Sequence, residues 1–391
     1  SVVTDDLLRS GIHVAFDQSG AGLAGDEDLF VYSEALPDDA PERRRAKELG
    51  IRSLSYPEAV GELTKGFQLI AVCGSHGKSS TTAKAARILI NAGVDPTIIV
   101  GTRLQELNGK NWRRGASTVF LLEACEYRRS FLNYSPVTIL LTNAEPDHLD
   151  YFSSGQDYED AFKEFVAKLP QNGTLILHKS DAPSARIATS AAAKVIDADT
   201  EEFAQLSTPG IHMQRNAQLV QALAREFGID PFAGNVDLQG YSGSWRRMEF
   251  LGKTKEGITV IDDYGHHPTE VRSTLQALRQ SFPKARVVCV FQPHTHHRTL
   301  ALYDEFTKAF SNCDVLLIPN VYDARSNIEN GAVDLEKFAV DISKNSGCEV
   351  HWTKNLQETE DHLRASVLTS GDVLICMGAG DITKLAHALV P

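Results

Sequence analysis

Short apolar runs alternate with amphipathic stretches along almost the whole chain. The runs have the length of buried strands, and they cover residues 69–73, 119–123, 137–141, 174–178, 258–261, 287–291, 315–318 and 373–377. Between them, apolar positions recur with helical spacing over residues 78–92, 158–169, 216–227, 268–282, 300–310 and 383–389. Strands that alternate with helices predict an α/β fold, with parallel sheets flanked by helices on both faces.

Two interruptions of this pattern predict domain boundaries. The first lies at residues 64–66, and the second lies at residues 236–244, where glycines and serines separate a helix from a strand. We therefore expect domains at residues 1–66, 67–237 and 238–391. A nucleotide-binding α/β domain opens with a strand, a glycine-rich turn and a helix. Residues 1–66 contain a predicted helix at 39–49 but no such opening, so we expect a partial domain that lacks its first βα unit.

Composition and charge narrow the class of protein. The chain has 391 residues, with 39 Lys and Arg against 51 Asp and Glu and a net charge of −12. Its 42% hydrophobic and 23% charged residues are ordinary for a globular protein and exclude a disordered or collagenous chain. The acidic balance argues against nucleic-acid binding, which needs a basic surface, but it allows a phosphorylated small ligand at a locally positive loop.

The sequence gives no sign of membrane insertion or secretion. No apolar run approaches the ~20 residues of a membrane-spanning helix, and the first residues are polar and acidic, unlike a signal peptide. The six cysteines are scattered without the spacing of metal ligands. We therefore expect buried free thiols in a cytoplasmic protein.

A glycine loop after the strand at 69–73 is the strongest chemical signal. A buried strand, a short glycine-containing turn and a helix N-terminus let backbone N–H groups converge on a phosphate. The spacing is G-x-x-G-K-S, in which Lys78 can reach the β- and γ-phosphates and the Ser79 hydroxyl can hold Mg²⁺. The residues expected to bind the nucleotide here are Gly74, Ser75, His76, Gly77, Lys78, Ser79 and Ser80.

Acidic and histidine side chains follow several of the predicted strands. Glu123 ends one strand, and polar residues that include His148 follow the next, where open α/β sheets place their ligands. A carboxylate there can bind Mg²⁺, or it can simply be solvated. A loop histidine can bind a metal or lie on the surface.

The last predicted domain carries further groups with two possible roles. Two acids, an aromatic residue and two histidines at residues 262–267 fit contacts to a sugar, an adenine or a substrate carboxylate better than a zinc site. Arg246 and Arg247 can brace a transferring phosphoryl group or form a surface pair. The donors at 291–298 and the glycine turn at 378–380 can each serve a ligand or only the fold.

Taken together, these stretches resemble the Mur ligases. The matching segments are VYSEALPDDAPE (31–42), VCGSHGKSSTT (72–82), LEACEYRRSFL (122–132), TNAEPDHLDYF (142–152), IDDYGHHPTEV (261–271), FQPHTHHRT (291–299) and MGAGDI (377–382). The resemblance implies a UDP-sugar-binding domain, a central P-loop-type ATPase domain, and a C-terminal dinucleotide-fold-like domain that brings the amino acid. It is strongest for the members that join L-alanine to the lactyl carboxylate of UDP-N-acetylmuramate through an acyl phosphate, in peptidoglycan precursor synthesis.

The same resemblance implies roles for individual residues. Lys78 and Arg247 would neutralise charge during phosphoryl transfer from ATP, and Ser79, Glu123 and His148 would lie on the Mg²⁺ (or Mn²⁺) side. Asn216 would read the adenine and Asp263 the ribose, with Tyr264 close to the nucleotide. The amino-acid site would lie near Tyr264, His266 and Arg298, so that the expected catalytic set is Lys78, His148, Arg247, His266 and Arg298.

Three positions depart from the family pattern. In H-N-x-x-N an asparagine is replaced by Met213, in R-R-F-E the phenylalanine is Met248, and in F-Q-P-H-R-x-x-R the first arginine is Thr295. Two alternatives therefore remain at this point: a recycling ligase that joins a tripeptide to UDP-N-acetylmuramate, or an ATP-binding paralogue without ligase activity. In each case we expect a monomer or homodimer without nucleic-acid or membrane partners.

Overall fold

The structure is a computed structural model that describes residues 2–323 and 331–390 and divides into two compact units. The first unit runs to Gly66 and adds Ser130–Ser135, whereas the second comprises Phe67–Arg129 and continues from Pro136. Among the described residues, no helix combines the length and the apolar character needed to cross a membrane.

The first unit contains three helices and a small parallel sheet in the residues that the structure describes. The helices are α1 (Val2–Arg9), α2 (Pro41–Glu48) and α3 (Tyr56–Leu63), and the strands are β1 (Phe30–Tyr32) and β2 (Ser53–Ser55). Helix α2 confirms the prediction at 39–49. Helix α3 was not predicted, although Ser55 and Glu58 form a capping box at its start.

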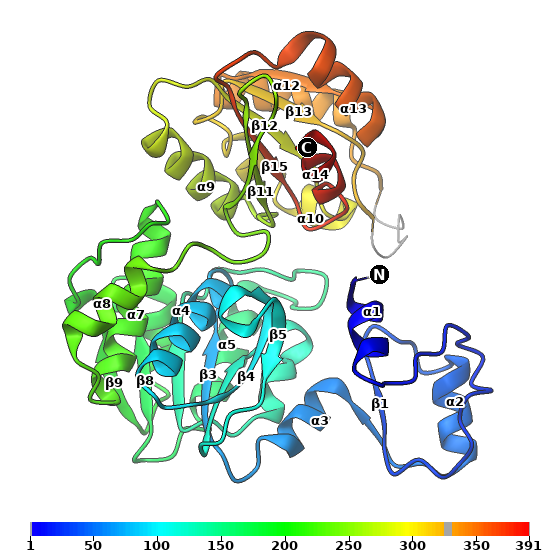
Figure 1. Ribbon diagram of the computed structural model, residues 1–391, viewed down its shortest axis with the longest axis vertical. Helices are drawn as coiled ribbons and strands as arrows, with labels where there is room; N and C mark the ends of the chain where they lie inside the picture. Colours follow the sequence, from blue (N-terminus) through cyan, green and yellow to red (C-terminus); the bar gives the residue numbers. More distant parts are fainter. Residues whose placement is uncertain (1, 324–330, 391) are drawn as a thin grey trace. The chain divides into compact units, whose positions relative to one another are not determined.

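A seven-stranded sheet forms the first part of the second unit (Figure 1). Its order is β5-β4-β6-β3-β7-β8-β9, and only β5 runs antiparallel to its neighbour. The strands are β3 (Gln68–Cys73), β4 (Thr97–Leu104), β5 (Lys110–Arg113), β6 (Val119–Glu123), β7 (Thr138–Leu141), β8 (Thr174–Leu177) and β9 (Lys194–Asp197). The helices that accompany them are α4 (Lys78–Asn91), α5 (Gly155–Val166), α6 (Ala182–Ala188), α7 (Ile211–Glu226) and α8 (Pro231–Gln239).

A six-stranded sheet forms the second part of this unit. Its order is β10-β11-β15-β12-β13-β14, with β10 antiparallel to β11. The strands are β10 (Glu249–Lys253), β11 (Thr259–Asp263), β12 (Val287–Phe291), β13 (Val315–Ile318), β14 (Glu349–Trp352) and β15 (Val373–Met377). The helices are α9 (Pro268–Ser281), α10 (His296–Ala301), α11 (Tyr303–Thr307), α12 (Leu335–Ser346), α13 (Leu356–His362) and α14 (Thr383–Leu389).

Both faces of the second sheet are buried, as the apolar runs predicted. Along β12, Val287, Cys289 and Phe291 join one hydrophobic cluster. Val288 and Val290 join another on the opposite face. This alternation explains why the strand reads as a continuous apolar run, since neither face meets water. Every predicted strand is present, with bounds within two residues of those expected.

Two expectations need correction, one about a helix and one about the burial of the cysteines. The helix predicted at 300–310 is two short helices, because Leu302 (φ −114°, ψ 26°) leaves helical geometry between them. The first of them begins at His296, where Thr295 caps it by accepting a hydrogen bond from the Arg298 N–H. Of the six cysteines, all are free, but Cys125 is exposed rather than buried.

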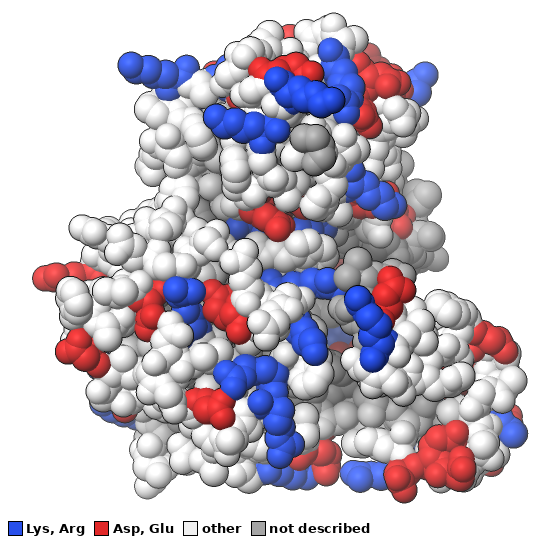
Figure 2. All heavy atoms as spheres, viewed as in Figure 1, with Lys and Arg blue, Asp and Glu red and all other residues white. Residues whose placement is uncertain are grey.

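Side chains of both charges are mixed on one face of the molecule. On the face shown in Figure 2, Lys and Arg are interspersed with Asp and Glu, and no large surface of one sign is visible. With a net charge of −12, the chain therefore depends on individually placed cations to hold an anionic ligand.

The glycine that ends β3 gives the first testable prediction. Gly74 has φ +133°, and a Cβ at this position would lie against Thr142 Oγ1 and 2.7 Å from the Asn143 carbonyl oxygen. We expect Gly74→Ala to lower the free energy of unfolding by about 2–3 kcal/mol. The measurement is a chemical denaturation curve. Gly234→Ala is the matched control, because a Cβ there meets nothing within 4 Å, and equal midpoints for the two variants would contradict the prediction.

Candidate functional site

The carboxyl ends of β3, β6 and β7 bring three polar segments of the sequence to one edge of the first sheet. They face the turns that follow β11 and β12 across a cavity of about 810 Å³. Most of the predicted site residues line this cavity, namely Ser75, His76, Lys78, Ser79, Glu123, His148, Arg247, Tyr264, His266 and Arg298. Both sheets of the second unit, which are formed by segments far apart in sequence, therefore contribute residues to one cavity.

The glycine loop holds its lysine in place before any ligand is present. Gly77 (φ +83°) is the N-cap of α4, a backbone geometry that favours glycine. Lys78 Nζ donates to the Gly74 carbonyl (2.5 Å) and to the Ser75 carbonyl (3.1 Å). Lys78 Nζ also lies 2.9 Å from Oε2 of Glu126, whose side chain is fully buried. Burial alone would lower the pKa of Lys78, but the Glu126 carboxylate outweighs it and raises that pKa, so Lys78 is a fixed cation.

Two of the three predicted metal residues lie together. Ser79 Oγ donates to Glu123 Oε1 at 2.9 Å, and the Gly101 N–H donates to Glu123 Oε2 at 2.8 Å. A hydroxyl and a carboxylate are the oxygen donors that Mg²⁺ prefers, so this pair fits a hard divalent cation. His148 instead faces Glu126, with its Nε2 3.6 Å from Glu126 Oε1.

The predicted amino-acid side of the cavity is built around Arg298. Its Nη2 donates to Asp147 Oδ1 at 3.0 Å, and its Nη1 lies 3.2 Å from His294 Nδ1. Burial would raise the pKa of Asp147, but Arg298 holds it well below its usual range. Thr295 caps the helix that carries Arg298.

His266 and Tyr264 lie on the same side. Burial lowers the pKa of His266 to about 3, so its ring is neutral at pH 7. Its Nδ1 lies 3.1 Å from the Tyr264 carbonyl oxygen. The Arg247 guanidinium stacks over the Tyr264 ring at 5.0 Å from the centroid, which orients the arginine within the cavity.

The two neighbouring arginines have different roles. Arg246 is 4% exposed and donates to the Gly378 and Gly380 carbonyls, and its Nε lies 3.3 Å from Asp262. Arg246 therefore ties its own segment to the glycine turn at 378–380. Its burial and its hydrogen bonds both fit a structural role. Arg247 remains the arginine that can meet a ligand.

A second cavity, of about 460 Å³, opens beside the glycine loop and contains Asn216 and Asp263. Asn216 packs so close to the loop that a Cβ on Gly77 would lie 2.6 Å from its Oδ1. Asp263 accepts hydrogen bonds from the N–H groups of Met248 and Gly265, both at 2.8 Å. Burial raises the pKa of Asp263 to about 6. Tyr264, which was predicted beside the nucleotide, lines the larger cavity.

A buried lysine under this second cavity was missed by the sequence analysis. Lys84 Nζ lies 3.4 Å from the sulfur of Met213 and 4.1 Å from the centroid of the Tyr241 ring. Burial lowers the pKa of Lys84 to about 7. Lys84 lies within a helix whose spacing gives no sign of function, so only the fold reveals this contact.

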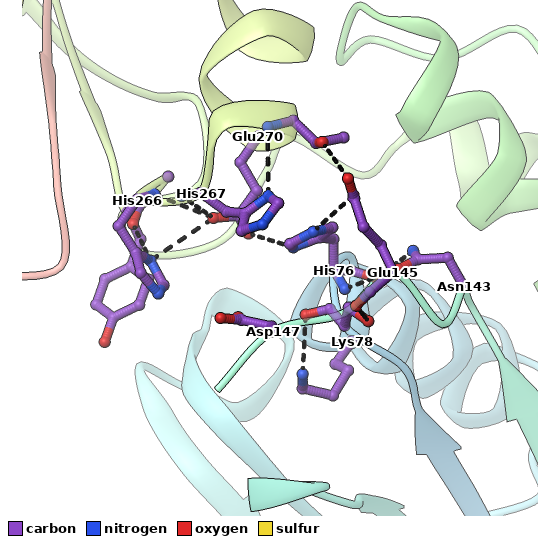
Figure 3. Close-up of polar contacts among 12 residues, drawn as sticks. His76, Lys78, Asn143, Glu145, Asp147, His266, His267 and Glu270 are labelled. Atoms are coloured by element: carbon purple, nitrogen blue, oxygen red, sulfur yellow. Dashed lines mark hydrogen bonds and ion pairs between the residues drawn. The ribbon is translucent and has the colours of Figure 1, made fainter. Parts of the chain in front are cut away.

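A cluster of polar contacts joins the glycine loop to α9 (Figure 3). His76 lies between two carboxylates that the sequence analysis did not single out, with Nε2 3.1 Å from Glu145 Oε2 and Nδ1 3.5 Å from Glu270 Oε1. Burial alone would lower the pKa of His76, but these carboxylates raise it to about 10. The ligand atoms of His76, Glu145 and His267 also lie within 4.8 Å of one another, a spacing that suits a metal ion.

Sequence profiles of one family match the chain in order. The Mur ligase family catalytic domain matches residues 1–68, the Mur ligase middle domain residues 72–230, and the Mur ligase glutamate ligase domain residues 246–380. Among curated relatives, UDP-N-acetylmuramate–L-alanine ligase of Clostridium acetobutylicum is 37% identical over 99% of this chain and 89% of its own length. That of Lachnospira eligens is 35% identical over 100% of this chain and 90% of its own length.

Solved structures show the same architecture. The UDP-N-acetylmuramate–alanine ligase of Thermotoga maritima is 25% identical, with a TM-score of 0.79 over 100% of this chain and 90% of its own. A murein peptide ligase from Psychrobacter arcticus is 20% identical, with a TM-score of 0.72 over 99% of this chain and 90% of its own. These matches establish a fold in which three domains follow one another along the chain.

The charge states of the three site histidines can be tested directly. We expect His76 to remain an imidazolium at pH 8, and His266 and His267 to be neutral at pH 5, because burial lowers the pKa of His267 to about 4. Ring ¹⁵N chemical shifts, assigned with single histidine-to-glutamine variants, measure this. A neutral His76 at pH 8 would contradict the arrangement described above.

The same raised pKa predicts how His76 affects stability. Because the folded-state pKa lies above the ordinary 6.5, the contribution of His76 to stability is fully present below pH 6.5. It is lost as the pH rises through about 10. The stability difference between the wild type and His76→Gln, measured by denaturation at several pH values, should therefore shrink over this interval, and a constant difference would contradict it.

Proposed function

Because the chain belongs to the Mur ligase family, we propose that it joins L-alanine to the lactyl carboxylate of UDP-N-acetylmuramate in an ATP-dependent reaction. The relatives that carry this activity in their names align with nearly the whole chain. The single observation that supports the proposal most strongly is the shared cavity, in which Lys78, Arg247 and Arg298 meet from two parts of the fold.

The chemistry requires that two anions come together. An oxygen of the substrate carboxylate attacks the γ-phosphorus of ATP, and ADP leaves, so that an acyl phosphate forms. The free amine of L-alanine then attacks the acyl carbon, the carbon–oxygen bond breaks, and inorganic phosphate leaves with the proton that the amine gives up. Lys78 and Arg247 offset the repulsion between carboxylate and triphosphate, and because both are already fixed by neighbouring groups, little reorganisation is needed.

We propose Ser79 and Glu123 as the residues that hold Mg²⁺ or Mn²⁺, with His148 on the same wall of the cavity. The cation, when bound, would neutralise charge on the phosphate oxygens. For the nucleotide, we propose the second cavity, with Asn216 at the adenine and Asp263 at the ribose. At pH 7 Asp263 is mostly ionised, since its pKa is about 6, so it can accept hydrogen bonds from ribose hydroxyls.

The amino-acid substrate would bind near Arg298, His266 and Tyr264. Arg298 can pair with the carboxylate of L-alanine, although Asp147 now holds part of its guanidinium. His266 is neutral at pH 7 and so does not repel the ammonium group of the incoming amino acid. Because residue 295 is a threonine, Arg298 is the one arginine in residues 291–298. Thr295 also caps α10 and so fixes the backbone that carries Arg298.

We propose residues 1–66 for UDP-sugar binding, 67–237 for ATP binding, and 238–391 for closing the site with the amino acid. A cytoplasmic location fits these substrates. An assay that offers L-alanine and a tripeptide in competition separates the proposed activity from that of a recycling ligase, and preference for the tripeptide would overturn it.

Loss of the loop lysine gives the main test. We expect Lys78→Ala to lower L-alanine-dependent ADP release by about 10²–10³-fold or more, because the fixed cation acts where negative charge crowds in the transition state. ADP release with UDP-N-acetylmuramate and L-alanine measures this. Lys168→Ala, at an exposed position beyond the site, serves as the control and should keep the wild-type rate. A Lys78→Ala variant with the same rate as this control would refute the assignment.

A further inference from the structure

His76 differs from the rest of the glycine loop because both of its ring nitrogens face carboxylates. Its Nε2 lies 3.1 Å from Glu145 and its Nδ1 lies 3.5 Å from Glu270. Only the imidazolium can donate from both nitrogens. The His76 side chain is 13% exposed, so the ion pairs are partly shielded from solvent.

The two carboxylates belong to different parts of the fold. Glu145 follows β7 in the central part, whereas Glu270 lies in the first turn of α9 in the C-terminal part. Thr269 Oγ1 in the same turn also donates to Glu145 Oε1, at 2.7 Å. His76 is thus the cationic centre of a bridge between the nucleotide loop and α9.

Glu270 also contacts residues of the larger cavity and so connects the bridge to them. Its Oε2 accepts from the His266 N–H (3.0 Å) and from the His267 N–H (3.3 Å). Its Oε1 lies 3.6 Å from Arg247 Nη1. A shift of Glu270 would therefore move both the backbone at His266 and the guanidinium of Arg247.

The backbone of His76 is held independently of its side chain. Its N–H donates to Asn143 Oδ1 at 3.1 Å, and its carbonyl accepts from Asn143 Nδ2 at 3.0 Å and from Thr142 Oγ1 at 2.6 Å. A change of the side chain should therefore leave the glycine loop in place. This separation makes the bridge testable apart from phosphate binding.

The cluster favours a proton over a metal ion at His76. Metal binding would have to displace the proton that His76 Nε2 shares with Glu145. It would also require the other tautomer of His267, whose Nδ1 accepts from the Thr269 N–H at 3.3 Å. His267 Nε2 then carries the ring proton and has no partner among the described residues.

We propose that the His76 imidazolium is a positioning residue that clamps the nucleotide loop to α9 and thereby places Arg247 and His266 for the reaction. The proposal rests on the ligase function proposed above. The charged and titratable groups around the ring are Glu145, Glu270 and Asp147, and the His267 ring lies 4.6 Å away between centroids, tilted by 39°. Without the cation, Glu145 and Glu270 lose their shared partner, and repulsion between them opposes the docking of α9.

The first experiment compares binding with turnover in His76→Gln. We expect its Kd for a non-hydrolysable ATP analogue, measured by calorimetry, to stay within about threefold of the wild type, because Lys78 and the loop backbone are unchanged. We expect kcat to fall by about 30-fold or more and the KM for L-alanine to rise, since Arg247 and His266 lose their placement. Equal losses in ATP affinity and kcat would overturn the proposal, because they would indicate a phosphate contact.

A double-mutant cycle with Glu145→Gln tests the clamp itself and serves as a second variant if His76→Gln folds poorly. We expect Glu145→Gln to lower kcat when it is introduced alone. In the His76→Gln background it should lower kcat little further, because both substitutions break the same ion pair between His76 and Glu145. Fully multiplicative effects on kcat would overturn the clamp. Thr269→Val is the matched control, since it removes the 2.7 Å bond to Glu145 and leaves the ion pairs intact.

Hydrogen exchange separates failure of the clamp from failure of the proposed function. With the ATP analogue bound, the backbone amides of residues 265–272 should be more protected in the wild type than in His76→Gln, whatever the reaction is. Equal protection would overturn the clamp even in an active ligase. Stoichiometric Zn²⁺ binding to the wild type that His267→Gln abolishes would also overturn it, because the cluster would then be a metal site.

Discussion

The arrangement of the second unit depends on one electrostatic constraint: fixed cations must be available in an acidic protein to bring anions together. The chain carries a net charge of −12, so its overall field repels phosphates and carboxylates. Lys78 is such a fixed cation, because it forms an ion pair with the buried Glu126. Arg298 is another, because it forms an ion pair with Asp147. Each cation is held by an acid and by nearby polar groups, which fixes its position but leaves part of its charge to be shared with a ligand.

The same constraint explains why the cavity lies where it does. The carboxyl ends of parallel strands meet at one edge of each sheet, and the loops that follow them can carry polar groups without disturbing the buried strands. Glu123 is the last residue of β6, and Lys78 and His148 follow β3 and β7, the next two strands of the first sheet. Arg298 and His266 follow two strands of the second. Five residues that are distant in sequence thus line one cavity because two sheets present the same kind of edge.

Sequence patterns predicted buried strands of the two large sheets, but they missed the strands at the sheet edges, β5, β9, β10 and β14, and they predicted the partners of the site residues poorly. Strands such as β12 were predictable because both faces are buried and the apolar run is continuous. β4 was missed because Gly101 and Arg103 interrupt its apolar character. The helix expected from residue 300 begins at His296, because Thr295 caps it there, and it ends at Leu302, which leaves helical geometry.

The remaining site chemistry could not be predicted because it depends on contacts across the fold. The motif around His76 indicated phosphate binding, but Glu145 and Glu270 come from two later segments, and no local spacing relates them to His76. In the same way, Arg246 and Arg247 are neighbours in sequence, and only the fold separates a backbone tie from a cavity-facing guanidinium. The contact between Lys84 and Met213 likewise forms only when α4 packs on α7.

The central claim is that the cavity activates the substrate carboxylate by transferring a phosphoryl group to it. Isotope transfer tests this most directly. UDP-N-acetylmuramate labelled with ¹⁸O in both oxygens of its lactyl carboxylate would be incubated with ATP, Mg²⁺ and L-alanine, and the released phosphate would be analysed by mass spectrometry. We predict one ¹⁸O atom in each phosphate, because the carboxylate oxygen that attacks the γ-phosphorus leaves with it. Phosphate without the label, released together with the amide product, would contradict the claim.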